Sequence, residues 1–86
     1  MERNVTIGTK AGLHARPAAQ IIKAAGKFQS KIELMRGAKA VNIKSLISLM
    51  SLGAKQGEEL VLRAEGPDAA EALEALGALL DRDLDA

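Results

Sequence analysis

The sequence predicts an α+β domain in which a four-stranded antiparallel sheet carries three helices on one face. The prediction rests on short segments of alternating apolar and polar residues, longer segments with apolar residues at helical spacing, and a hairpin signal between two strands. Along the chain the elements follow the order βαββαβα. A chain of 86 residues forms a single domain, residues 1–86, with a thin core and no room for a deep catalytic cavity. We therefore expect the functional residues on the surface.

The first part of the chain predicts a strand, a loop and a helix. Val5 and Ile7 alternate with polar residues, which is typical of a strand, and residues 8–12 form a glycine-containing loop. A helix is expected over about residues 15–27, where Pro17 suits the first turn. The apolar stripe of this helix consists of Ala18, Ile21, Ile22 and Ala25.

The middle of the chain predicts a hairpin followed by a short helix. Ile32 and Leu34 alternate with polar residues, and a turn at residues 37–38 leads to a third strand over residues 40–43. Residues 45–53 then form a short helix, which Ser45 is expected to cap through its hydroxyl.

The last part predicts a strand over residues 58–65 and a helix over residues 69–80. Asp68 and Glu71 have the spacing of a capping box at the start of that helix. Carboxylates at a helix C-terminus oppose the helix dipole, so the end of the chain is expected to fray. These carboxylates belong to Asp81, Asp83 and Asp85.

Composition excludes several functions. The formal net charge is +1, and Phe28 is the only aromatic residue, which argues against a nucleic-acid-binding sheet of the RNA-recognition type. There is no cysteine and one histidine, so neither a zinc site of nitrogen and sulfur ligands nor a catalytic triad can be assembled. No metal or cofactor is expected. The polar segment 1–6 and the lack of a long apolar run predict a cytoplasmic protein with no membrane partner.

The one histidine, His14, stands directly before the first predicted helix. The first backbone N–H groups of a helix, here those of Ala15 and Arg16, have no internal partner and favour an anion. Arg16 adds a planar set of donors suited to phosphate oxygens, and Gly12 lets the backbone turn closely. This arrangement predicts a phosphate site that contains a nucleophilic imidazole. The residues alone also allow a simpler interpretation, in which His14 is a surface or helix-capping residue.

Two segments give the sequence a specific resemblance to a known family. The segment GLHARPA, residues 12–18, and the segment VNIKSLI, residues 41–47, continued by residues 50–53, resemble HPr, the histidine phosphocarrier of the bacterial phosphoenolpyruvate:sugar phosphotransferase system. The resemblance covers nearly the whole chain. It implies an open-faced β-sandwich of four antiparallel strands and three helices.

The resemblance also implies roles for single residues. His14 would accept a phosphoryl group on its Nδ1 (pros) atom from Enzyme I and pass it to the A domain of a sugar-specific enzyme II. Arg16 would stabilise the phosphoryl group and attract acidic partners. The carrier would form a phosphohistidine without being an enzyme. A carrier with one small docking face is expected to be a monomer.

Ser45 and its neighbours have both a structural and a functional interpretation. In many related proteins the serine matching Ser45 is phosphorylated by a regulatory kinase, which implies a serine kinase/phosphorylase and a transcriptional regulator as further partners. A phosphate there would add about two negative charges to the docking face. The short helix cannot bury every apolar residue, so we expect an apolar docking patch. Its residues are Ala15, Ala19, Leu46, Ile47 and Met50; Leu49 and Leu52 are assigned to the core.

Two departures from the family pattern leave the regulation open. Gly37-Ala38 replaces the Asn-Gly of many members, and Ser48 stands where some regulated members carry glycine.

A nitrogen-related or purely regulatory phosphotransfer branch would use the same chemistry, and the sequence names neither the acceptor protein nor any sugar.

Overall fold

The computed structural model describes residues 1–85 and contains all seven predicted elements; Ala86, the last residue of the predicted domain, lies outside the described residues. Most boundaries lie within two residues of those predicted. The elements are β1 (Glu2–Thr6), α1 (Ala15–Ala25), β2 (Lys31–Arg36), β3 (Lys39–Asn42), α2 (Leu46–Ser51), β4 (Glu59–Glu65) and α3 (Ala69–Leu80).

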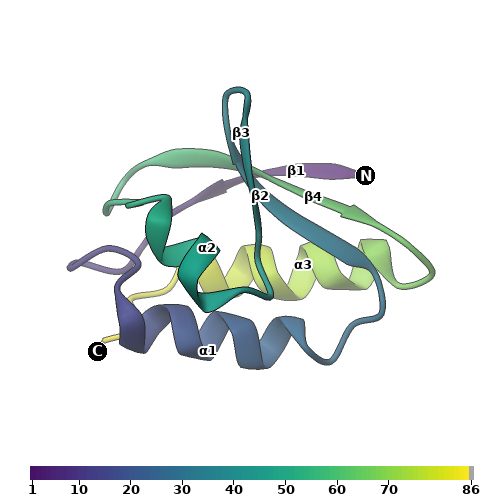
Figure 1. The fold of residues 1–86 in the computed structure, drawn as a ribbon, viewed down its shortest axis with the longest axis horizontal. Helices are drawn as coiled ribbons and strands as arrows, with labels where there is room; N and C mark the ends of the chain where they lie inside the picture. Colours follow the sequence, from purple (N-terminus) through teal and green to yellow (C-terminus); the bar gives the residue numbers. More distant parts are fainter. Residues whose placement is uncertain (86) are drawn as a thin grey trace.

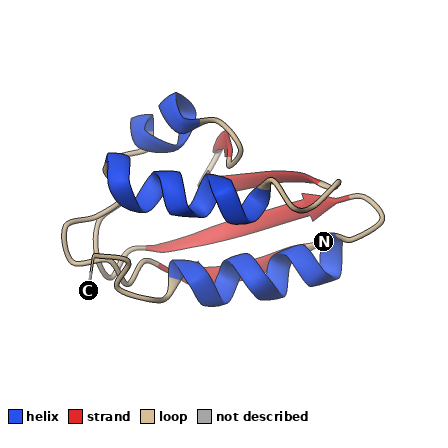
Figure 2. Cartoon of the chain, turned by 90° about the horizontal axis from the view of Figure 1, so that it is seen from below, coloured by secondary structure: helices blue, strands red, loops and turns tan. Residues whose placement is uncertain are grey.

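The four strands form one antiparallel sheet in the order β1-β4-β2-β3, with all three helices on one side (Figures 1 and 2). The hairpin between β2 and β3 turns through Gly37-Ala38. Gly37 has φ +56°, while no residue other than glycine has positive φ among those described. The first turn residue, Gly37, has positive φ and the second, Ala38, does not, which fits a type II′ turn. Asn-Gly favours the type I′ turn, in which both residues have positive φ. The predicted fold class is confirmed.

The strand register aligns apolar residues in rows on the helix-covered face. Val5 lies opposite Leu60, and Leu34 lies between Leu62 and Val41. The helices complete the core with fully buried side chains, among them Ala18, Ile21, Leu49, Leu76 and Leu80. The opposite face of the sheet is open and polar, as in the pair between Arg63 Nη2 and Glu33 Oε1 at 2.6 Å. The arginine lowers the pKa of the Glu33 carboxyl, mainly through this hydrogen bond.

The predicted capping box at α3 is wrong. Asp68 is the residue before α3, but its carboxylate makes no cap hydrogen bond. It accepts instead from the backbone N–H groups of Gln29 and Ser30, each at 2.9 Å, and from the Ser30 hydroxyl. Asp68 therefore joins the loop before β2 to the start of α3. These hydrogen bonds lower the pKa of its carboxyl, with the Ser30 hydroxyl as the largest cause.

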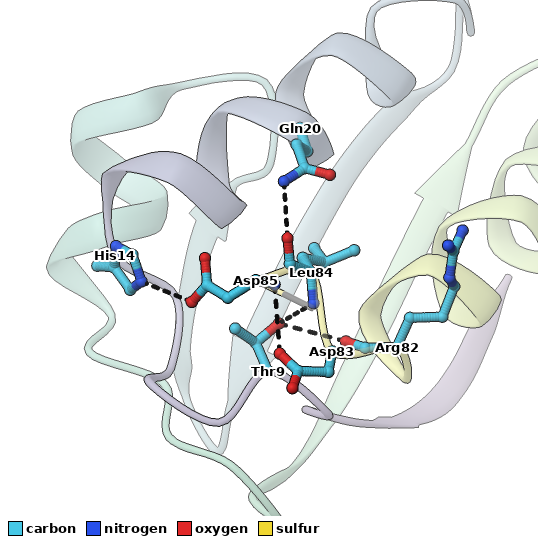
Figure 3. A network of polar contacts seen from close by, with 7 residues as sticks. All are labelled: Thr9, His14, Gln20, Arg82, Asp83, Leu84 and Asp85. Carbon is cyan, nitrogen blue, oxygen red and sulfur yellow. Dashed lines mark hydrogen bonds and ion pairs between the residues drawn. The ribbon is translucent and has the colours of Figure 1, made fainter.

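The predicted fraying after α3 is also wrong for the described residues. The segment after α3 folds back toward the start of α1 (Figures 1 and 3), where Leu84 is 8% exposed and belongs to the hydrophobic core. The hydroxyl of fully buried Thr9 donates to the Arg82 carbonyl and accepts from the Leu84 N–H, both at 3.2 Å. Burial of one leucine and these hydrogen bonds outweigh the unfavourable dipole interaction, which amounts to about 0.3–1 kcal/mol per exposed charge.

Candidate functional site

A tight loop brings His14 to the start of α1. Gly12 has φ +79°, and a Cβ atom added there would lie 2.6 Å from the Ala54 carbonyl oxygen. The next residue, Leu13, is buried and donates its N–H to that same oxygen at 3.0 Å. Only glycine fits this close approach in a left-handed conformation. The loop thus fixes the direction in which the backbone enters α1.

His14 occupies the N-cap position of α1 in an extended conformation, but its side chain makes no cap hydrogen bond. His14 is therefore an exposed surface residue that begins α1 without capping it through its side chain, and of the simpler interpretation only side-chain capping is wrong. The imidazole is 47% exposed. Among residues 1–85, its Nδ1 atom has no hydrogen-bond partner, whereas its Nε2 atom lies 2.9 Å from Asp85 Oδ2. One ring nitrogen is thus open to an incoming group and the other is engaged.

The amino end of α1 presents two free backbone donors. Ala18 N–H donates to the His14 carbonyl and closes the first turn, and Pro17 has no N–H. Within residues 1–85, the N–H groups of Ala15 and Arg16 have no backbone or side-chain partner. These donors and the positive end of the helix dipole lie next to the imidazole and favour a bound phosphoryl group. Arg16 is exposed, and no ion pair holds its guanidinium in the part of the chain that the structure describes.

His14 borders an open hollow that also involves α2 and the loop after it. The hollow brings together His14, Met50 and Lys55, with Ala11, Leu13, Gly53 and Ala54 around them. Sequence reasoning did not single out Lys55. Lys55 lines this hollow because the loop after α2 packs against the loop before α1, as the hydrogen bond between Leu13 and Ala54 shows.

The predicted docking residues are exposed on α1 and α2, which pack against each other. Ile47 is 82% exposed, far more than an ordinary core residue, and Leu46 and Met50 are about two-fifths exposed. Ala15 and Ala19 are exposed on α1. Leu49 and Leu52 are buried, as predicted. We call the five exposed residues, Ala15, Ala19, Leu46, Ile47 and Met50, the apolar patch.

Ser45 caps α2 as predicted, since its Oγ accepts the Ser48 N–H at 3.3 Å. It is partly exposed and directly precedes Leu46 and Ile47 of the apolar patch. Any group added to this hydroxyl would therefore alter the surface beside the patch.

The contact between His14 and Asp85 is the part of the site that sequence reasoning missed. The two residues are 71 positions apart, and the three aspartates at the end of the chain predicted fraying instead. The one available signal was Leu84, an apolar residue among acidic ones, which could have indicated an anchor for this segment.

Two further classes of site find no support among residues 1–85. These residues contain no group of three or more His, Cys, Asp or Glu side chains that could hold a metal ion. None of the helices they form is both long and apolar enough to cross a membrane.

Comparison with known proteins identifies the family. The family model described as "PTS HPr component phosphorylation site" matches residues 1–82. The chain is 47% identical over 74 residues to the phosphocarrier protein HPr of Treponema pallidum, covering 86% of this chain and 84% of the relative. It is 43% identical over 81 residues to HPr of Vibrio cholerae, covering 94% and 95%.

A solved structure has the same fold. The crystal structure of HPr-C-His from Thermoanaerobacter tengcongensis has a TM-score of 0.91 and 43% identity, covering 100% of this chain and 97% of that one. The structure places an exposed histidine at the amino end of α1, and the family model matches residues 1–82. The chain therefore belongs to the HPr family, whose members carry phosphoryl groups in the phosphotransferase system of sugar transport and are not themselves enzymes.

Proposed function

We propose that His14 accepts a phosphoryl group on Nδ1 from phosphorylated Enzyme I and passes it to the A domain of a sugar-specific enzyme II. The observation that carries this proposal is an exposed imidazole, with Nδ1 free among residues 1–85, beside the unpaired amides of Ala15 and Arg16. The single domain of residues 1–86 performs this role in the cytoplasm as a monomer without cofactor or metal.

The chemistry requires a phosphohistidine that is stable enough to form but not so stable that the phosphoryl group cannot be transferred again. Hydrogen bonds to charged groups contribute about 1.5–3 kcal/mol each in favourable settings, and less where solvent competes. Two backbone donors and an exposed arginine therefore stabilise the phosphohistidine by a few kcal/mol at most. An open site of this kind suits a carrier, because the same phosphoryl group must be transferred again.

The apolar patch supports recognition of protein partners. An exposed isoleucine next to two partly exposed apolar side chains marks an interaction surface, and methionine adapts to several partners. Exposed Arg16, two residues after His14, and Lys55, which lines the same hollow as His14, favour partners with an acidic docking face. Enzyme I and the enzyme II A domain would bind this same surface in turn.

The proposal is tested by intact-mass analysis after incubation with phosphoenolpyruvate, Mg²⁺ and purified Enzyme I. We expect the gain of one acid-labile phosphoryl group, and no gain in His14→Ala. A folded wild-type protein that gains nothing, while Enzyme I phosphorylates itself in the same tube, would refute the carrier role. Transfer to purified A domains then separates a sugar branch from the alternative, a nitrogen-related or purely regulatory branch.

A second proposed role is regulation through Ser45 by a serine kinase/phosphorylase, with a transcriptional regulator as reader of the modified form. The partly exposed position of Ser45 beside Leu46 and Ile47 favours it, because a phosphate there would repel an acidic partner. Ser45→Asp and Ser45→Asn compare a charged with a neutral side chain of the same shape. We expect only the charged variant to slow uptake from Enzyme I; equal rates would contradict the idea.

A further inference from the structure

The hydrogen bond between His14 and Asp85 determines which ring nitrogen carries the proton. An ionised carboxylate can only accept hydrogen bonds. The 2.9 Å contact of Asp85 Oδ2 with Nε2 (Figure 3) therefore requires a hydrogen on Nε2. A neutral imidazole has one N–H, so its lone pair then lies on Nδ1, the nitrogen that has no partner among residues 1–85.

Asp85 is held in place by the fold rather than by this one contact. Leu84 is buried, its N–H donates to Thr9, and its carbonyl accepts from Gln20 Nε2 of α1 at 3.0 Å. The N–H of Asp85 donates to the Asp83 carboxylate at 3.2 Å. Thr9 lies in the loop before His14 and Gln20 in the helix after it. The segment that carries Asp85 is thus attached on both sides of the phosphate site.

We propose that Asp85 is a positioning residue for phosphoryl transfer: it holds the Nε2–H tautomer of His14, orients the ring, and leaves the Nδ1 lone pair as the nucleophile. This inference rests on the proposed carrier role of His14. It assigns a role to the segment after α3, a segment that contributes neither to the apolar patch nor to the free amides at the start of α1.

The transfer step is balanced without further reactants. The Nδ1 lone pair forms the new N–P bond while the N–P bond of the donor phosphohistidine breaks, and that electron pair returns to the donor nitrogen. His14 keeps the proton on Nε2, so its ring carries a delocalised positive charge once Nδ1 is phosphorylated. Asp85 lies opposite that charge and stabilises it, as a carboxylate does for an imidazolium in hydrolase triads.

The effect should be moderate because the pair is accessible to solvent, with side-chain exposures of 47% and 27%. Exposed ion pairs and hydrogen bonds change equilibria about two- to fivefold. The carboxylate also repels an incoming phosphoryl group, but it lies on the Nε2 side of the ring, whereas Arg16 and the helix amides lie at the helix start where the phosphoryl group would bind. The stabilisation of the positively charged ring by Asp85 therefore outweighs its repulsion of the phosphoryl group, and the carboxylate favours transfer.

The first test measures the tautomer directly and needs no phosphoryl donor. Long-range ¹H–¹⁵N NMR correlations of protein labelled at histidine would be recorded at pH 9, where an ordinary imidazole is neutral. We expect the Nε2–H tautomer to dominate in the wild type and the tautomer ratio to fall about two- to fivefold in Asp85→Ala. Asp85→Asn keeps an acceptor oxygen and should give an intermediate ratio. Asp81→Ala, in the same segment, is the matched control and should match the wild type.

The second test measures the rate of phosphoryl uptake at saturating phosphorylated Enzyme I. Asp85→Ala should slow this single-turnover rate about two- to fivefold without changing half-saturation, and Asp81→Ala should not. An unchanged tautomer, an unchanged rate or faster uptake in Asp85→Ala overturns the role of Asp85, even if the wild type is an active carrier. If the tautomer ratio falls in Asp85→Ala but the wild-type protein takes up no phosphoryl group, the carrier role of His14 is overturned instead, and the positioning role of Asp85 with it.

Discussion

Replacing Gly12 by alanine should destabilise the fold more than the same change at another glycine of similar φ. Any Cβ at φ +79° costs about 1–2 kcal/mol relative to a right-handed conformation. At Gly12 the Cβ would also lie 2.6 Å from the Ala54 carbonyl oxygen, well inside ordinary contact. The loop must move, which adds an overpacking cost of about 1–3 kcal/mol and weakens the Leu13–Ala54 hydrogen bond.

Gly57 provides the matched control. It has φ +84°, and a Cβ there would meet nothing within 4 Å, so Gly57→Ala carries the backbone cost alone. Gly12→Ala should therefore lose about 1–3 kcal/mol more than Gly57→Ala. For a chain of this size each kcal/mol lowers Tm by about 4–8 °C, so the Tm values of the two variants should differ by about 4–24 °C.

Thermal unfolding followed by circular dichroism measures both variants, and uptake of the phosphoryl group from Enzyme I measures the site. Because Gly12 is two residues from His14, Gly12→Ala should also slow uptake, while Gly57→Ala should not. Equal Tm values for the two variants would refute the reasoning, since the close approach of the loop to Ala54 would then cost nothing.

Three further predictions follow from other contacts. Leu84→Ala should lower the free energy of unfolding in urea by about 2–3 kcal/mol, because it removes a buried side chain; a loss below about 0.5 kcal/mol would show that the end of the chain is not packed. The lowered pKa of Asp68 means that its hydrogen bonds stabilise the fold above the ordinary aspartate pKa of about 4, a contribution lost as the pH falls through the lower folded-state pKa. The stability difference between wild type and Asp68→Asn should thus be largest near neutral pH and shrink toward pH 2, and a difference that stays constant would contradict this. Ile47→Ser should leave Tm nearly unchanged, because the side chain is 82% exposed, yet weaken binding to Enzyme I about five- to tenfold in calorimetry; unchanged binding would remove Ile47 from the docking surface.

The element order and the placement of His14 at the start of α1 could be predicted because their signals are local. Alternation at Val5 and Ile7 and helical spacing in α1 depend on neighbours within a few residues. The same holds for the position of His14 before Pro17, which places the imidazole at a helix start. The capping of α2 by Ser45 was correct for the same reason, since donor and acceptor are three residues apart.

Local patterns were insufficient where a side chain finds a distant partner. Asp68 matched a capping box, yet Ser30 and Gln29 compete for its carboxylate and are nearly forty positions away in the sequence. The aspartates after α3 oppose the helix dipole, but the buried position of Leu84 outweighs that local cost.

The sequence by itself therefore determined the α+β architecture, the family, and the position of the one histidine at a helix start, where we propose that it accepts a phosphoryl group. Only the tertiary structure decided that Lys55 lines the same hollow as His14 and that Asp85 contacts the Nε2 atom of His14. The physical reason is that helices, strands and caps follow from the preferences of adjacent residues. The meeting of His14 and Asp85 depends instead on how the core places the end of α3 beside the start of α1.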